Sequence, residues 1–198
     1  MNLSEEIINK NYVTWTECLK NYDCLSDEML EDIGEDIKNA SWSLDVKNGA
    51  GRGSMLRVVL KNLCTIAAHI NDGAFGDNGK GGDKHQLLKV DRKSLMKVLL
   101  LQHISKAIIF TPTTEQWKKN KGMLYDFNNE LSTTMKLGER SIFICMKYGI
   151  KLTEEEYEAM RIVDKDEEKS YGFLNPLCEI VKIANQLTAI EVFRTENN

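Results

Sequence analysis

The segment from Ser94 to Phe110 constrains the fold more than any other part of the sequence. Its apolar side chains recur at short spacings that cover most of the circumference of a helix. They are Leu95, Val98, Leu99, Leu101, Ile104 and Ile108. Because apolar surface is unfavourable in water, such a helix must be surrounded by other elements. We therefore predict a single helix over residues 94–110 at the centre of the fold.

Length and composition fit one globular unit. A chain of 198 residues is one ordinary domain, or one domain with an appended arm. With 42% apolar and 28% charged residues, it can bury a sizeable core. No apolar run approaches the roughly 20 residues that cross a bilayer, and the first residues do not resemble a signal peptide. We therefore expect a protein without a membrane span that works inside a cell.

The five cysteines are scattered along the chain without a Cys-x-x-Cys motif. They are Cys18, Cys24, Cys64, Cys145 and Cys178. An odd number at such wide spacing argues against a disulfide framework or a zinc ribbon. We predict that they are buried free thiols.

Charge is divided unevenly along the chain, although the net charge is only −4. Residues 1–36 carry 10 acidic and 2 basic side chains, giving −8. Residues 37–123 carry 6 acidic and 15 basic, giving +9, and residues 124–198 carry 14 and 9, giving −5. Such polarity can direct the acidic surface of one copy onto the basic surface of the next, or bring nucleic acid to the middle third. The plain alternative is a solvated surface with scattered charges.

Two helices are predicted near the N-terminus. Ser4 is a suitable N-cap with acidic residues in the turn that follows it, and a second helix begins at Ser26 in the same way. The apolar face predicted for the first helix consists of Ile7, Ile8, Val13, Trp15 and Leu19. We interpret residues 1–40 as an acidic helical arm that packs on the domain or on a partner, and residues 41–198 as the main helical domain.

The rest of the chain is predicted to be mainly α, with one small β-hairpin. Ser54 is expected to cap a helix that ends near Ile70. Aromatic residues alternate on both sides of Asn120–Gly122, which predicts strands over Glu115–Lys119 and Met123–Phe127. Further helices are predicted over residues 138–148, 153–163 and 175–193. The buried face predicted for the last of them consists of Leu177, Ile180, Val181, Ala184, Leu187 and Ile190.

Two segments are predicted to be exposed loops. The Gly-rich stretch 73–82 lacks the first glycine and the Ser/Thr of a phosphate-binding P-loop, and no buried strand precedes it. The charged stretch 164–170 is typical of a surface turn.

Four segments, in the expected order, resemble motifs of the HD-domain phosphohydrolases. The central one, Leu-Leu-Gln102-His103-Ile-Ser-Lys106, is similar to the family's Leu-Leu-His-Asp-Ile-Gly-Lys. The other three segments are 137–142, 151–161 and 180–185. The resemblance covers about residues 50–195 and implies an HD-like helical bundle. Whole strings such as Glu-Ala-Met-Arg-Ile-Val-Asp-Lys also resemble degenerate HD-like proteins of crAss-like tailed bacteriophages.

The resemblance also implies that the family's metal site has been replaced. HD enzymes hold one or two divalent cations through imidazoles and carboxylates, and these ions generate a hydroxide nucleophile. The residues assigned by the resemblance to the vestigial pocket are Val58, Gln102, His103, Lys106, Leu137, Val163, Lys182 and Asn185. Since no carboxylate is among them, we expect a pseudoenzyme with no metal and no other cofactor.

The sequence has too few histidines to rebuild a metal site elsewhere, because it contains only His69, His85 and His103. We predict that His103 is an interior residue hydrogen-bonded to Gln102 or Asn185. Lys106 either contacts phosphate in the vestigial pocket or is a surface lysine whose amine reaches solvent.

Three functions remain open from the sequence. The favoured one is a non-catalytic structural protein acting through protein–protein contacts, as a homo-oligomer and with other phage structural proteins. It would belong to a neck or tail ring, in the host cytoplasm during assembly or in the virion. The second is a metal-dependent nucleotide phosphohydrolase with relocated ligands. The third is a nucleotide or nucleic-acid sensor that binds an anion through Gln102, His103, Lys106 and Lys182.

Overall fold

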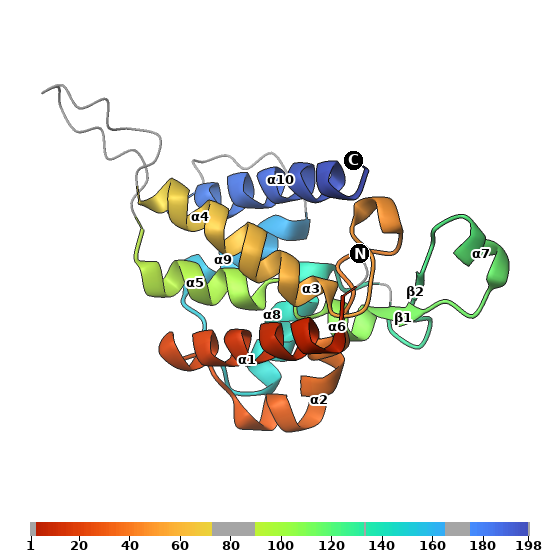
Figure 1. Ribbon diagram of the computed structural model, residues 1–198. Helices are drawn as coiled ribbons and strands as arrows, with labels where there is room; N and C mark the ends of the chain where they lie inside the picture. Colours follow the sequence, from red (N-terminus) through yellow and green to blue (C-terminus); the bar gives the residue numbers. More distant parts are fainter. Residues whose placement is uncertain (1–2, 73–89, 133, 165–174, 198) are drawn as a thin grey trace, which may run out of the picture.

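Helices make up most of the fold, as predicted, and one small antiparallel strand pair accompanies them (Figure 1). The computed structural model describes residues 3–72, 90–132, 134–164 and 175–197. The α-helices are α1 Glu5–Asn21, α2 Asp27–Asn39, α3 Ser54–Val58, α4 Cys64–Asn71, α5 Arg92–Leu101, α6 Lys106–Ile109, α7 Gln116–Asn120, α8 Leu137–Lys147, α9 Glu154–Arg161 and α10 Pro176–Asn197. The strands are β1 Phe110–Pro112 and β2 Tyr125–Phe127. The predicted loop 73–82 and nearly all of the predicted turn 164–170 lie outside the described residues.

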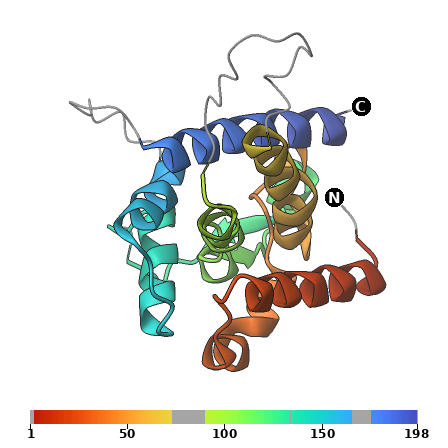
Figure 2. The same ribbon diagram turned by 90° about the vertical axis from the view of Figure 1, so that its left-hand side faces the viewer.

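Helix α5 lies at the centre of the molecule. Figure 2 shows it nearly end-on, with α1, α4, α9 and α10 around it. The apolar side chains that predicted this burial are solvent-inaccessible, with the exception of Ile108, which is partly buried. The prediction of a buried central helix is therefore confirmed for residues 92–101.

The predicted helix over 94–110 is wrong beyond Leu101, because residues 102–105 form a tight turn. Ser141 of α8 stabilises the break. Its hydroxyl donates to the carbonyl of Gln102 (2.9 Å) and accepts from the amide of Ser105 (3.2 Å). Both groups would otherwise bond within the helix. The chain resumes as the short helix α6 and enters β1 at Phe110.

Helices α1 and α2 pack on the rest of the chain. Trp15 is completely buried, and its indole Nε1 donates to the carbonyl of Leu100 in α5 (3.1 Å). The core is therefore continuous across the boundary predicted at residue 40. Ile7 and Val13 are exposed, so the predicted apolar face of α1 is narrower than its sequence indicates.

Local capping signals place the starts of four helices, α1, α2, α9 and α10, correctly. The hydroxyls of Ser4 and Ser26 accept from the third amide of α1 and α2, at 3.4 Å and 3.3 Å. Thr153 and Glu156 cap α9 reciprocally, and Asn175 caps α10. Each of these starts was predicted, because the capping residues lie next to the groups that they satisfy.

The helix predicted over 54–70 is continuous but not uniform. Helices α3 and α4 are joined by a π-helical turn, Val59–Leu63. The residue before the helix is Gly53 with φ 72°, so the predicted cap at Ser54 is wrong. A side chain at Gly53 would collide with Ile8, because its Cβ would lie 2.7 Å from Ile8 Cγ1.

The strand pair differs from the predicted hairpin in its first strand. β1 pairs with β2 in antiparallel register, with Phe110 opposite Phe127 and Pro112 opposite Tyr125. The predicted strand over Glu115–Lys119 is wrong, because these residues lie at and in helix α7. We call residues 110–127 the lobe, since they stand out from the helical body at the right of Figure 1.

Helix α10 is longer than predicted and less buried. It ends at Asn197, whereas the sequence predicted an end near Phe193. Leu187 and Ile190 were predicted to be buried and are exposed. Its first half carries most of the burial, through Leu177, Ile180, Val181 and Ala184. Among the helices that the structure describes, none is both long and apolar enough to cross a membrane.

The five thiols are free, and all except the partly exposed Cys18 are buried, as predicted.

Candidate functional site

The turn after α5 and the middle of α10 bring together a buried polar cluster, which consists of Gln102, His103, Lys106 and Asn185. His103 Nε2 lies 3.0 Å from Asn185 Oδ1. Asn185 Nδ2 donates to Gln102 Oε1 at 3.0 Å and to the carbonyl of Val181 at 2.9 Å. The side chain of Asn185 thus connects Gln102 and His103, the two residues that the resemblance aligns with the His-Asp pair of HD enzymes. The predicted pairing of His103 with Asn185 is present.

The ammonium of Lys106 is held by Trp42. Lys106 Nζ donates to the carbonyl of Trp42 at 2.7 Å and lies 3.4 Å from the centre of the Trp42 ring. The same ring packs edge-on against His103, with 4.6 Å between the ring centres. Lys106 is only 7% exposed, so the prediction of a surface lysine is wrong. The tight turn before α6 directs this side chain inward, which helical periodicity alone does not reveal.

Burial sets the protonation of the cluster. It lowers the pKa of Lys106 to about 7, because a charged amine is poorly solvated in the interior. Burial, and next the nearby charge of Lys106, hold the pKa of His103 well below its usual value. His103 is therefore neutral at pH 7. Since the amide of Asn185 is donating to Gln102 and Val181, its oxygen accepts, and His103 Nε2 carries the proton.

The remaining residues assigned to the vestigial pocket do not join this hydrogen-bonded cluster through their side chains in the described contacts. Val58 is buried in the core on α3, and the carbonyl of Leu137 accepts from the hydroxyl of Ser105 at 2.8 Å. Val163 packs on Gly138, whose Cβ position would lie 2.9 Å from Val163 Cγ1. Lys182 is exposed on α10, unlike the buried Gln102, His103 and Lys106 with which it was grouped.

The sequence analysis assigned no structural role to three residues, Trp42, Ser141 and Asp164, that support the polar cluster or the helix next to it. Trp42 lies in a loop, and nothing near it in sequence indicates that its ring covers Lys106 and His103. Ser141 bridges to the turn 102–105 from α8. Asp164, predicted to lie in a surface turn, accepts from the amides of Gly138 and Glu139 at 2.6 Å and 3.2 Å and so caps α8. All three contacts join residues far apart in sequence, so no local pattern could have found them.

The residues present do not fit the divalent cation of an HD enzyme. Hard cations of that kind require several oxygen or imidazole ligands, with carboxylates to balance their charge. The polar cluster offers two amides and one neutral imidazole beside an ammonium group, which repels a cation. In the described part of the chain, no group of three or more His, Cys, Asp or Glu side chains is placed to hold a metal ion. His85 lies outside the described residues.

Two polar atoms of the cluster remain unpaired. Gln102 Nε2 and His103 Nδ1 are buried without a hydrogen-bond partner among the residues that the structure describes. One is a donor and the other an acceptor, so together they carry no net preference for an anion or a cation.

Comparisons of this chain with protein-family models, with curated proteins and with solved structures find no match. The resemblance to the HD family therefore rests on the motifs quoted above.

Proposed function

We propose that this chain is a non-catalytic HD-like protein that assembles through protein–protein contacts, as a ring component of a tailed-phage particle or of its assembly. The observation that carries the proposal is the buried polar cluster, which contains no carboxylate. Asn185 bonds to both Gln102 and His103, and Lys106 bonds to Trp42, at the positions where the resemblance would place the metal of an HD enzyme. These residues offer no ligand set for a divalent cation, which supports a non-catalytic role. The phage setting derives from the sequence resemblance alone.

The lobe offers one half of a contact between copies. Trp117 on α7 is 54% exposed, and Lys119 and Lys121 are exposed beside it. Lys118 is engaged within the lobe, at 2.8 Å from Asp126 and 3.0 Å from Glu115. An exposed indole flanked by cations is a favourable anchor, since Trp is enriched at the centres of interfaces.

Helix α2 offers the complementary half. Its exposed face is strongly acidic and consists of Asp27, Glu28, Glu31, Asp32, Glu35 and Asp36. Opposite charge on the lobe and on α2 would direct one copy onto the next. This is the charge division that the sequence shows between residues 1–36 and residues 37–123.

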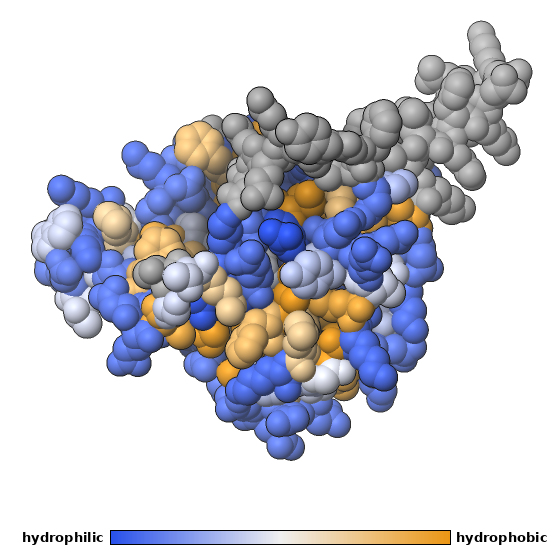
Figure 3. Space-filling model, turned by 180° about the vertical axis from the view of Figure 1, so that it is seen from behind, coloured by the Kyte–Doolittle hydropathy of each residue, from blue (hydrophilic) through white to orange (hydrophobic). Residues whose placement is uncertain are grey.

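The positions of these two surfaces favour a head-to-tail arrangement. Figure 1 shows α2 at the bottom of the molecule and the lobe at its right edge, so the two proposed halves of the contact are separate surfaces. Contacts between different surfaces of successive copies generate closed rings or open filaments. Apolar surface is also visible on the face opposite to the view of Figure 1 (Figure 3). Phe143 and Met146 of α8 and Tyr157 of α9 are exposed, but the proposal does not use them.

Mass measurement after size-exclusion chromatography tests the proposal. The wild-type chain should form oligomers that dissociate at high salt, because the contact is partly ionic. Lys119→Glu/Lys121→Glu on the lobe and Glu28→Lys/Glu31→Lys on α2 should each give monomers. An equimolar mixture of the two variants should assemble again, because the intact lobe of one meets the intact α2 of the other, and the reversed charges on the remaining two surfaces are also complementary. Lys182→Glu, on the exposed face of α10, is the matched control and should assemble normally.

A monomeric wild-type protein at high concentration would contradict the proposal. So would a mixture of the two variants that stays monomeric. If instead the wild-type protein binds nucleic acid and the lobe variant does not, the lobe serves the nucleic-acid alternative.

A further inference from the structure

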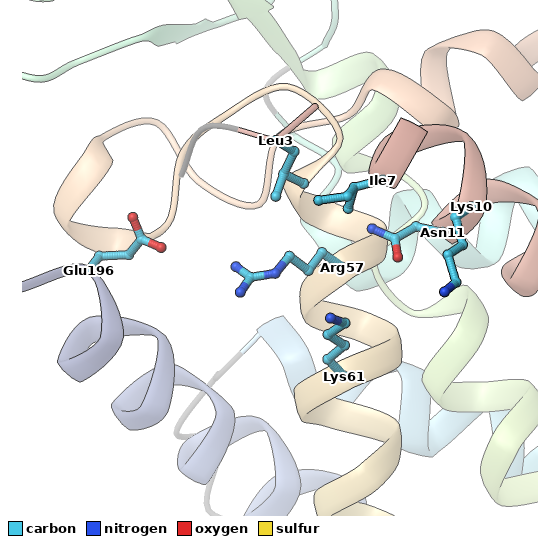
Figure 4. A pocket seen from close by; sticks show the side chains of 7 residues that line it. All are labelled: Leu3, Ile7, Lys10, Asn11, Arg57, Lys61 and Glu196. Atoms are coloured by element: carbon cyan, nitrogen blue, oxygen red, sulfur yellow. The ribbon is translucent and has the colours of Figure 1, made fainter. Parts of the chain in front are cut away.

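A second region, away from the polar cluster, has the features of a ligand site. A hollow of about 490 Å³ lies between α1, the α3–π-turn helix and the end of α10 (Figure 4). Its lining residues are Leu3, Ile7, Lys10, Asn11, Arg57, Lys61 and Glu196. This volume lies within the roughly 300–1,000 Å³ range of small-molecule sites. We call it the α1–α10 pocket.

Positive charge dominates the α1–α10 pocket. It is lined by three cationic side chains, Lys10, Arg57 and Lys61, against the single carboxylate of Glu196, which leaves two net positive charges. Arg57 and Lys61 are four residues apart on one continuous helix, and Figure 4 shows their charged ends on the same side. Like charges at this spacing repel each other, and an anion placed between them would relieve the repulsion.

A buried hydrogen-bond donor independently indicates the same ligand chemistry. Asn11 is only 7% exposed, and its Nδ2 has no hydrogen-bond partner among the described residues. Figure 4 shows its amide on the pocket side of α1, directed toward the Arg57 side. A buried N–H without an acceptor is unfavourable, and an oxygen of a bound anion would satisfy it.

The backbone beneath Lys61 is also unusual. Lys61 lies within the π-helical turn Val59–Leu63. Such turns are rare within α-helices and are frequent at functional sites, where the added residue alters the direction of a side chain. Here the turn lies where the helix faces the pocket.

We infer that the α1–α10 pocket binds a small phosphate-bearing molecule. Phosphate carries close to two negative charges at neutral pH and has several acceptor oxygens, which matches the cations and the Asn11 amide. Leu3 and Ile7 form an apolar side of the same pocket, suited to the organic part of the ligand. This inference is independent of assembly through the lobe and α2.

Calorimetric titration of the full chain tests it with adenosine monophosphate, ribose 5-phosphate, inorganic phosphate and adenosine. The phosphate compounds should bind and adenosine should not. Lys10→Gln/Lys61→Gln should weaken binding of the tightest phosphate compound by about tenfold or more, because two cations are lost. Glu196→Gln should tighten it, because a negative charge leaves the pocket. Lys20→Gln/Lys119→Gln removes two exposed cations elsewhere and should bind as wild type does.

Circular dichroism on each variant verifies that the fold is retained, and Glu196→Gln gives a result that misfolding cannot mimic. Absence of binding by all phosphate compounds at millimolar concentration would overturn the inference. Equal affinity of the wild-type and Lys10→Gln/Lys61→Gln proteins would do the same. If that double variant changes only the oligomer mass, the pocket is a protein contact and the inference is wrong. The lobe variant Lys119→Glu/Lys121→Glu should bind phosphate compounds normally, which separates this inference from the proposed assembly.

Discussion

Replacing Lys106 with methionine tests the account of the polar cluster through the dependence of stability on pH. Burial lowers the pKa of Lys106 to about 7, whereas lysine in an unfolded chain has a pKa of about 10.4. Between these two values the unfolded chain binds a proton that the folded chain has released. The contribution of Lys106 to the free energy of unfolding therefore rises with pH across this window, and it is most unfavourable below pH of about 7.

The expected size follows from the titration. One full proton of difference changes the free energy of unfolding by about 1.4 kcal/mol per pH unit. Because Lys106 is half-titrated at pH of about 7, the wild-type protein should gain about 1.6 kcal/mol relative to Lys106→Met between pH of roughly 7 and 8.5. Losing the hydrogen bond to the Trp42 carbonyl adds a cost of about 1 kcal/mol to the variant, and this cost does not depend on pH.

Other groups also titrate near the top of this window. Burial raises the pKa of Cys24, Cys64 and Cys145 to about 12, so the folded chain keeps thiol protons that the unfolded chain loses. Their contribution to stability therefore falls as pH rises above about 8.5, the ordinary thiol pKa. Both proteins contain the same thiols, so the difference between them isolates Lys106.

Urea unfolding followed by circular dichroism, at several pH values, gives the required difference. Lys182→Met removes an exposed lysine and should track the wild-type protein at every pH. If the difference between the wild-type and Lys106→Met proteins is constant from pH of about 7 to 8.5, Lys106 keeps its ordinary pKa. The description of Lys106 as a cation destabilised by burial would then be wrong.

Three further substitutions test other parts of the fold by the same urea unfolding measurement. Ser141→Ala should lower the free energy of unfolding by about 2 kcal/mol, since two buried backbone groups in the turn 102–105 lose their partner; a loss below about 0.5 kcal/mol would contradict this. Glu156→Gln should lower the free energy of unfolding by about 3 kcal/mol, because the ammonium of Lys97 loses its counter-ion. Lys97 Nζ lies 2.7 Å from Glu156 Oε2, and the Lys97 side chain is only 14% exposed. The double variant Lys97→Gln/Glu156→Gln should recover part of the lost stability. Trp15→Phe should lower the free energy of unfolding by about 2 kcal/mol, because the smaller side chain fills less of the core and the Leu100 carbonyl loses its donor. An unchanged free energy of unfolding would show that α1 is not part of the core.

Elements specified by neighbouring residues could be predicted from the sequence. Helices α1, α2, α9 and α10 begin where Ser4, Ser26, Thr153 and Asn175 can accept from amides a few residues ahead. The apolar pattern of α5 likewise indicates burial on all sides without reference to any partner. The far half of α10 was misjudged, because the same apolar spacing occurs whether or not another element covers it.

Features that depend on distant residues could not be predicted. The break in the helix predicted over 94–110 is stabilised by Ser141, which lies 36 residues beyond Ser105. The first predicted strand is helical, since alternation of aromatic and polar residues over so few positions also fits a single helical turn. In the candidate site, sequence reasoning predicted a bond from His103 to Gln102 or Asn185, but it gave Trp42 no role and left Lys106 either in the pocket or at the surface.

The most direct test of the central claim is an NMR titration of the imidazole signals of His103 with Mn²⁺. The account predicts that His103 stays neutral with its proton on Nε2 and that low Mn²⁺ concentrations leave its signals sharp, while the exposed His69 serves as the internal reference. Selective broadening of the His103 signals at stoichiometric Mn²⁺ would place a divalent cation at the cluster and contradict the account.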